Sequence, residues 1–202
     1  MRTIRDARRR TDAAAAAAIT ILATAAAAAA QTPVRPALPQ PSASALEPGL
    51  AVRYAFPAEV RFLGHAVAAL RREGEPGRPL VGLDYPDQGL GQPTLTSGRG
   101  EFVAAEIEGF VEFDQPGTWR LEIHSNDGVS VDIGGSAVDS FDGRRTCDTN
   151  GWVEIEVPEA GWYPVEVLFF QRYNSSCLMM RWEKPDGTRE WTPQSAWAYL
   201  PE

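Results

Sequence analysis

Short runs of alternating hydrophobic and polar residues fill the chain from residue 49 onward. Val103, Ala105 and Ile107 alternate with small or charged neighbours, and Trp119 and Leu121 continue the same period of two after a Pro-Gly pair. That period places successive side chains on opposite faces of a strand, so it indicates half-buried β-strands. Glycine, proline, asparagine and aspartate separate the runs. The pattern predicts an all-β fold, an antiparallel sandwich or barrel.

The remaining segments complete this outline. Strands are predicted at residues 50–56, 103–113, 119–124, 129–133, 153–157, 165–169 and 178–182. Residues 61–72 fit either a short helix or an irregular connection, and the glycines and prolines of residues 84–100 predict a long loop. Asn126, Asp127 and Gly128 lie between two strands, and these residue types tolerate positive φ, so they predict a hairpin turn.

The N-terminus predicts export. Five arginines in residues 1–10 precede an apolar, alanine-rich run at residues 13–30. This order is that of a secretory signal peptide, so residues 1–30 are predicted to be removed and the protein to be secreted or periplasmic. An uncleaved membrane anchor is the alternative; after cleavage we expect no transmembrane span.

Residues 31–48 are rich in proline, serine and alanine and hold few large apolar side chains. Such a segment buries too little surface to fold by itself, so it predicts a disordered linker. One folded domain is then expected over residues 49–202. A chain of 202 residues with 44% hydrophobic content has enough apolar material for it.

The charge argues against nucleic acid as a partner. The formal net charge is −8, and the first thirty residues hold five arginines against two aspartates, so their removal leaves −11. An acidic surface repels phosphate backbones. Cys147 and Cys177 remain after export, and an even pair in an oxidising compartment predicts a disulfide, with two buried free thiols as the alternative.

Three segments in order resemble one known family. Residues 110–135 read FVEFDQPGTWRLEIHSNDGVSVDIGG, residues 159–170 read EAGWYPVEVLFF, and residues 178–185 read LMMRWEKP. Together they resemble the core of the PA-fourteen domain, the lectin-like domain of anthrax protective antigen. The resemblance covers most of residues 49–202 and implies a β-sandwich of exported adhesins and toxins that frequently recognises glycans.

In carbohydrate-binding members of that family, two consecutive aspartates joined by a cis peptide hold Ca²⁺, which holds sugar hydroxyls. The matching pair here is Asn126 and Asp127, so the resemblance implies these as metal and ligand residues. One carboxylate is replaced by a neutral amide, which weakens the attraction for Ca²⁺. A plain turn without a cation is the alternative.

Aromatic rings offer further contacts, because an exposed ring stacks on the apolar face of a sugar. Trp119 and Trp182 follow the inward pattern of their strands, whereas Trp152 adjoins a turn and Tyr173 precedes Asn174 in a polar loop. Trp152, Tyr173 and Asn174 are therefore the other ligand candidates.

No catalytic motif stands out: the two histidines are far apart and no Gly-x-Ser-x-Gly elbow occurs. The sequence predicts a non-enzymatic, carbohydrate-binding module at the cell envelope, with a glycan or cell-surface polysaccharide as partner. A structural β-sandwich that contacts envelope proteins is the alternative.

Overall fold

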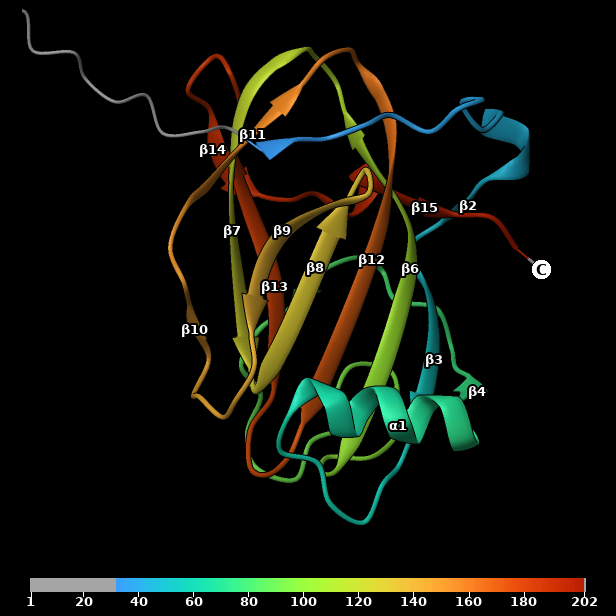
Figure 1. Ribbon diagram of the computed structural model, residues 1–202, viewed down its shortest axis with the longest axis vertical. Coiled ribbons are helices and arrows are strands. Elements are labelled where there is room, and N and C mark those ends of the chain that lie inside the picture. The colour runs from blue at the N-terminus through green and yellow to red at the C-terminus, as the bar shows by residue number, and fades with distance from the viewer. Residues whose placement is uncertain (1–31, 202) are drawn as a thin grey trace, which may run out of the picture. The chain divides into compact units, whose positions relative to one another are not determined.

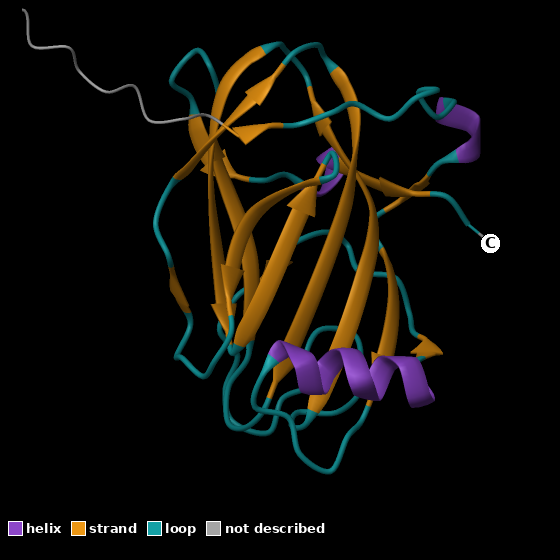
Figure 2. Ribbon diagram, viewed as in Figure 1, coloured by secondary structure: helices purple, strands orange, loops and turns teal. Residues whose placement is uncertain are grey.

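A computed structural model describes residues 32–201, which belong to one compact unit. Two β-sheets stack face to face in this unit, with one helix, α1, across the outer face of one sheet (Figures 1 and 2). All strand pairs are antiparallel except one at an edge, where β1 runs parallel to β11. The predicted antiparallel β-sandwich is confirmed.

The first sheet has the order β1-β11-β7-β13-β14, with β10 pairing β7 and β5 pairing β13. Its strands are β1 (Thr32–Pro33), β5 (Asp84–Tyr85), β7 (Gly117–Asn126), β10 (Asp148–Thr149), β11 (Val153–Val157), β13 (Cys177–Glu183) and β14 (Arg189–Trp191).

The second sheet has the order β2-β15-β6-β12-β8-β9, and β3 pairs with both β6 and β4. Its strands are β2 (Glu47–Pro48), β3 (Ala51–Ala55), β4 (Glu75–Pro76), β6 (Val103–Phe113), β8 (Gly128–Ile133), β9 (Ser136–Phe141), β12 (Gly161–Gln171) and β15 (Trp197–Tyr199). Short 3₁₀ helices lie at Ala43–Ala45 and Gln194–Ala196.

Aromatic side chains fill the space between the sheets. The Phe113 ring lies 4.9 Å from Trp119 and 5.2 Å from Tyr163, measured between centroids, and Trp119 lies 5.0 Å from Trp182. All four side chains are buried. Trp119 and Trp182 therefore face inward as their strand periods predict, and edge-to-face packing adds to the burial of apolar area.

Residues 61–72, which fit either of two structures, form the helix α1 (Leu63–Glu73). Ala66, Ala69 and Leu70 share one face of this helix and are buried against Phe170 and neighbouring residues of the second sheet. This packing selects the helix, because a short helix gains its stability from burial of one face.

The predicted hairpin at residues 126–128 is wrong. β7 belongs to the first sheet and β8 to the second, so the chain crosses between the sheets here. The Asn126–Asp127 peptide bond is cis, and neither residue has positive φ. A β-carbon added to Gly128 would lie 2.2 Å from the Phe170 ring, so this glycine lets the crossing approach β12.

The predicted disordered linker also differs from the structure. Val34 N donates to Glu156 O at 3.2 Å, Ala37 N donates to Trp162 O at 2.9 Å, and the Val34 side chain is 2% exposed. Residues 32–48 therefore run along the sandwich. A few well-placed contacts to existing strands order this segment, although its composition could not form a core alone.

The predicted signal peptide, residues 1–30, lies outside the described residues. Within residues 32–201, no helix has the length and hydropathy required to cross a bilayer.

Candidate functional site

The crossing from β7 to β8 forms the floor of a surface cleft. Asp127 Oδ1 accepts a hydrogen bond from Arg145 N at 3.2 Å, and Asp127 Oδ2 accepts one from Arg172 N at 2.9 Å. Ser125 Oγ donates to the Asp127 carbonyl oxygen at 2.8 Å. Asp127 is only 4% exposed, and its carboxylate thus ties together two loops that come from distant parts of the chain.

Burial raises the pKa of the Asp127 carboxyl above its usual value, because removal from water disfavours the charged form. The amide donors of Arg172 and Arg145 and the nearby cationic side chains of Arg144 and Arg172 oppose this rise with smaller effects. The carboxylate charge is thus directed toward backbone amides inside the protein.

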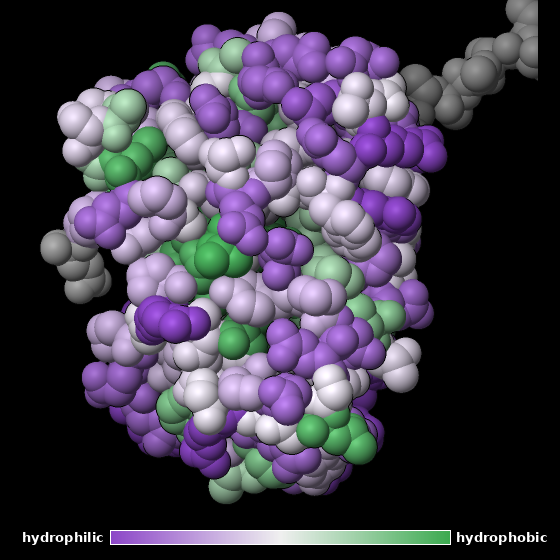
Figure 3. Space-filling view, turned by 180° about the vertical axis from the view of Figure 1, so that it is seen from behind, coloured by the Kyte–Doolittle hydropathy of each residue, from purple (hydrophilic) through white to green (hydrophobic). Residues whose placement is uncertain are grey.

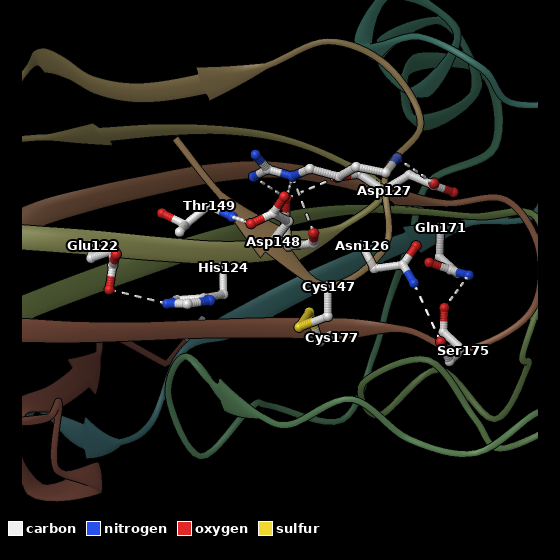
Figure 4. Close-up of a disulfide and its surroundings, with 12 residues drawn as sticks. Glu122, His124, Asn126, Asp127, Cys147, Asp148, Thr149, Gln171, Ser175 and Cys177 are labelled. Atoms are coloured by element: carbon white, nitrogen blue, oxygen red, sulfur yellow. Dashed lines mark hydrogen bonds and ion pairs between the residues drawn. A yellow bond between two sulfur atoms is a disulfide. The ribbon is translucent and has the colours of Figure 1, made fainter. Parts of the chain in front are cut away.

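The first wall of the cleft is the loop between β9 and β10. Cys147 and Cys177 form a disulfide with Cα atoms 5.7 Å apart, which confirms the predicted pair and fixes this loop to the start of β13 (Figure 4). The Arg145 guanidinium donates to Ser125 Oγ at 2.7 Å and to Asn150 Oδ1 at 3.0 Å. The disulfide and the Arg145 hydrogen bonds together fix the position of this loop.

The second wall is the loop between β12 and β13. Gln171 is fully buried, and its Nε2 donates to Tyr173 O at 2.6 Å and to Ser175 O at 2.8 Å. Asn126 Nδ2 donates to Ser175 Oγ at 3.4 Å, and Figure 4 shows Asn126 directed toward Ser175. Asn174 adopts a φ of 68° at the tip of this loop. These contacts fix the loop over the crossing.

The cleft between the two walls has a volume of about 380 Å³. Its lining residues are Asn126, Asp127, Arg144, Arg145, Thr146, Tyr173, Asn174 and Ser175. The structure therefore brings together four of the five predicted ligand residues, Asn126, Asp127, Tyr173 and Asn174. Asn126 and Asp127 are 5% and 4% exposed, so they line the floor of the cleft but offer a ligand little surface.

Trp152, the fifth predicted ligand residue, does not line this cleft. It lines a separate hollow of about 250 Å³ with Trp191, which is 47% exposed. The guanidiniums of Arg120, Arg181 and Arg189 lie 5.4, 5.1 and 5.5 Å from the Trp152 ring centroid. Trp152 therefore belongs to a separate cluster of aromatic and arginine side chains on the first sheet.

A hollow of about 340 Å³ also lies between α1 and the outer face of the second sheet. Arg53 and Glu106 line it and form an ion pair at 2.6 Å, so part of its charge is already neutralised. Figure 3 shows the opposite side of the molecule, where small hydrophobic patches are separated by polar side chains. The Asp127 cleft is the hollow that combines an aromatic ring, amides and hydroxyls.

The cleft does not suit Ca²⁺. This ion takes six to eight oxygen ligands and favours several carboxylates. Asp127 is the only carboxylate in the lining, both of its oxygens already accept amide hydrogen bonds, and Arg144 and Arg145 add positive charge. Among residues 32–201 no three acidic, histidine or cysteine side chains form a group that could hold a metal.

Three aspartates from neighbouring segments, which could add carboxylates to a cation site, lie elsewhere. Asp139 Oδ1 accepts a hydrogen bond from Asn150 Nδ2 at 2.7 Å, Asp142 Oδ1 accepts one from Leu63 N at 2.6 Å, and Asp132 lines the hollow near α1. None of these three lines the Asp127 cleft.

Sequence reasoning missed Arg144 and Arg145. Both precede Cys147, and the predicted disulfide to Cys177 could have located them, because it draws their loop toward the loop of Tyr173 and Asn174. A loop has no hydrophobic period from which the side-chain direction could be read.

Comparisons with known proteins define the class of fold. No family model matches the chain, and a search of curated proteins finds no match. Among solved structures, the chain is similar to the PA14 (PA-fourteen) domain of the MpAFP antifreeze protein, with TM-score 0.65, 14% identity, and coverage of 78% of this chain and 93% of that one.

Two further solved structures are similar. The PA14 sugar-binding domain of an RTX adhesin has TM-score 0.58 and 16% identity, with 75% of this chain and 98% of that one covered. The epithelial adhesin 9 A domain of Candida glabrata, in complex with Galβ1-3GlcNAc, has TM-score 0.63 and 12% identity, with 85% and 97% covered. At these identities the likeness shows the fold, which is PA14-like.

Proposed function

We propose that this chain is an exported carbohydrate-binding module and that the Asp127 cleft is its sugar site. The observation that carries the proposal is the convergence of Tyr173, Asn174 and Ser175 over the Asn126–Asp127 crossing. Sugar recognition requires groups that bind hydroxyls and a ring that stacks on the apolar face of a pyranose. The cleft contains both kinds of group within a volume that suits one or two sugar residues.

The setting supports the same proposal. Solved structures with this fold include a sugar-binding domain and an adhesin domain in complex with a disaccharide. A disulfide-bonded domain fits an oxidising compartment at or outside the cell envelope. The partner would be a glycan or cell-surface polysaccharide, bound without chemical change. Calcium is not part of this proposal, because the donor set does not suit it.

One observation favours a second candidate function. Asn126 and Asp127 are almost completely covered, and each oxygen of the Asp127 carboxylate accepts a backbone amide hydrogen bond. In this second function the Asn126–Asp127 segment only stabilises the fold, and the protein is a structural β-sandwich that contacts envelope proteins.

A glycan array in calcium buffer and in EDTA separates the two functions. We expect sugar binding in both conditions, and loss of at least about tenfold in affinity for Tyr173→Ala and Asn174→Ala, since each removes a direct contact. Trp191→Ala is the matched control, because this exposed ring lies outside the cleft. Absence of binding to every glycan in both conditions would support the structural sandwich instead.

A further inference from the structure

Arg144 and Arg145 line the Asp127 cleft and Arg172 adjoins Tyr173 beside it, and these three arginines differ in what they bind. Arg145 donates to Ser125 and Asn150, as described above. Arg172 Nε donates to Glu59 Oε1 at 2.8 Å, and its guanidinium lies 4.4 Å from the Tyr173 ring centroid. Both guanidiniums therefore already donate hydrogen bonds to other groups of the protein.

Arg144 is different. Its side chain is exposed, it lines the cleft, and its guanidinium carbon lies 6.0 Å from the centroid of the Tyr173 ring. Within residues 32–201 no side chain or backbone group forms a hydrogen bond or ion pair with this guanidinium. Arg144 therefore presents free, charged N–H donors to whatever enters the cleft beside Tyr173.

Asp127, the carboxylate in the cleft lining, lies near Arg144 but forms no ion pair with it. The Asp127 oxygens point to the amides of Arg145 and Arg172, and the carboxylate is buried. A ligand thus meets a free guanidinium, an aromatic ring, the Asn174 amide and the Ser175 hydroxyl. A planar guanidinium matches a carboxylate in a two-point, charge-assisted hydrogen bond.

We propose that the cleft binds a carboxylate-bearing sugar, such as a uronic acid residue, through Arg144 and without a metal ion. The inference rests on the proposed sugar-binding function and names its ligand class. Arg144 binds the carboxylate, Tyr173 stacks on the sugar ring, and Asn174 and Ser175 bind its hydroxyls. The exposed Arg144 guanidinium at the edge of the cleft supplies the positive charge that a metal would otherwise provide.

The charge of the whole protein restricts the ligand further. The net charge of −8 repels a densely anionic chain at long range. A single carboxylate at the end of a glycan is attracted by Arg144 at short range and meets little of that repulsion, because exposed charges are screened beyond about 8 Å in physiological salt. The favoured ligand is therefore a terminal acidic sugar.

Isothermal titration tests this with three probes: a disaccharide that ends in glucuronic acid, the same disaccharide ending in glucose, and one ending in a sulfated glucose. We expect the glucuronic acid probe to bind at least about tenfold more tightly than the glucose probe, in EDTA as in calcium, because a charge-assisted pair is stronger than a neutral hydrogen bond. Tighter binding of the sulfated probe would overturn the assignment to a carboxylate.

Variants locate the effect. Arg144→Ala should reduce binding of the acidic probe to the level of the glucose probe, and Arg144→Lys should restore part of it. Arg71→Ala is the matched control, since Arg71 is also exposed but lies on α1, away from the cleft. Circular dichroism confirms that each variant is folded.

The outcomes are distinguishable. Equal binding of the glucuronic acid and glucose probes, an Arg144→Ala protein that keeps the preference, or loss of binding in EDTA would overturn this inference while sugar binding itself stands. Binding of no glycan at all by the parent protein would overturn the proposed function with it.

Discussion

Asp127 Oδ2 accepts a hydrogen bond from Arg172 N at 2.9 Å, and so joins the crossing between the two sheets to the end of β12. The other carboxylate oxygen accepts from Arg145 N, so one side chain holds both walls of the cleft. Asp127, which the family resemblance implies as a ligand residue, therefore has a structural role: it links the two loops that form the cleft.

Asp127→Ala is expected to lower the free energy of unfolding by about 2 to 4 kcal/mol, because it leaves two amide donors with no protein partner. Urea unfolding followed by tryptophan fluorescence measures it. Thr146→Ala serves as the control, since Thr146 is exposed in the lining of the same cleft and a substitution there is expected to change stability by less than about 0.5 kcal/mol. Equal stability of the two variants would contradict a structural role of the Asp127 carboxylate.

The raised pKa of Asp127 predicts a particular pH dependence. Because the folded protein binds this proton more tightly than the unfolded chain, the group contributes stability below its unfolded pKa, and this contribution is lost as the pH rises through the folded pKa. Asp127→Asn cannot titrate. From about pH 4 upward, the stability of the parent protein should therefore fall relative to Asp127→Asn, measured by urea unfolding at a series of pH values. A constant difference across this range would refute the pKa shift.

The Cys147–Cys177 disulfide closes a loop with a sequence separation of 30 residues. Loop-closure entropy gives it a value of about 3.5 kcal/mol in the chain-entropy model. The double variant Cys147→Ala/Cys177→Ala should lose about this much stability. It should also bind glycans more weakly, because the loop that carries Arg144 and Arg145 loses its attachment to β13. Unchanged sugar affinity in a folded double variant would show that the loop is held by other contacts.

The strands could be predicted because hydrophobic and polar residues alternate along each of them. Ile107, Trp119 and Trp182 point inward as the alternation requires. The sheet to which each strand belongs was not predictable in this way. β7 and β8 are adjacent in sequence and lie in different sheets, and the contacts that fix the crossing, such as the hydrogen bond from Asp127 N to Phe170 O, join it to a distant strand.

The candidate site shows the same limit. Asn126, Asp127, Tyr173 and Asn174 meet in one cleft, but Trp152 lies in another hollow and Arg144 was not identified. The Cys147–Cys177 disulfide and the two-residue pairing of β10 with β7 together position residues 142–150, and so short a pairing has no sequence pattern. Loop residues gain their position from long-range contacts, which a local period cannot show.

Gly128 and Gly64 form a contrasting pair. Gly128→Ala would place a β-carbon 2.2 Å from the Phe170 ring, and a fully buried ring has little room to move, so we expect a loss of about 1 to 3 kcal/mol. Gly64→Ala lies in α1 with no atom within 4 Å of the added carbon, so it should stabilise the protein by up to about 1 kcal/mol. Thermal unfolding of both variants tests this, and a stable Gly128→Ala protein would mean that the crossing has room to shift.

Val34 and Leu38 test whether residues 32–48 belong to the folded domain. Val34 is 2% exposed and packs in the main core, whereas Leu38 is 84% exposed on the same segment. Val34→Ala should therefore lower the free energy of unfolding by about 1 to 2.5 kcal/mol through lost burial and an unfilled space, and Leu38→Ala by less than about 0.5 kcal/mol. Urea unfolding of both variants is the measurement. If Val34→Ala were as stable as Leu38→Ala, the segment would be a linker after all, because a side chain that contributes nothing to stability is not held in the core.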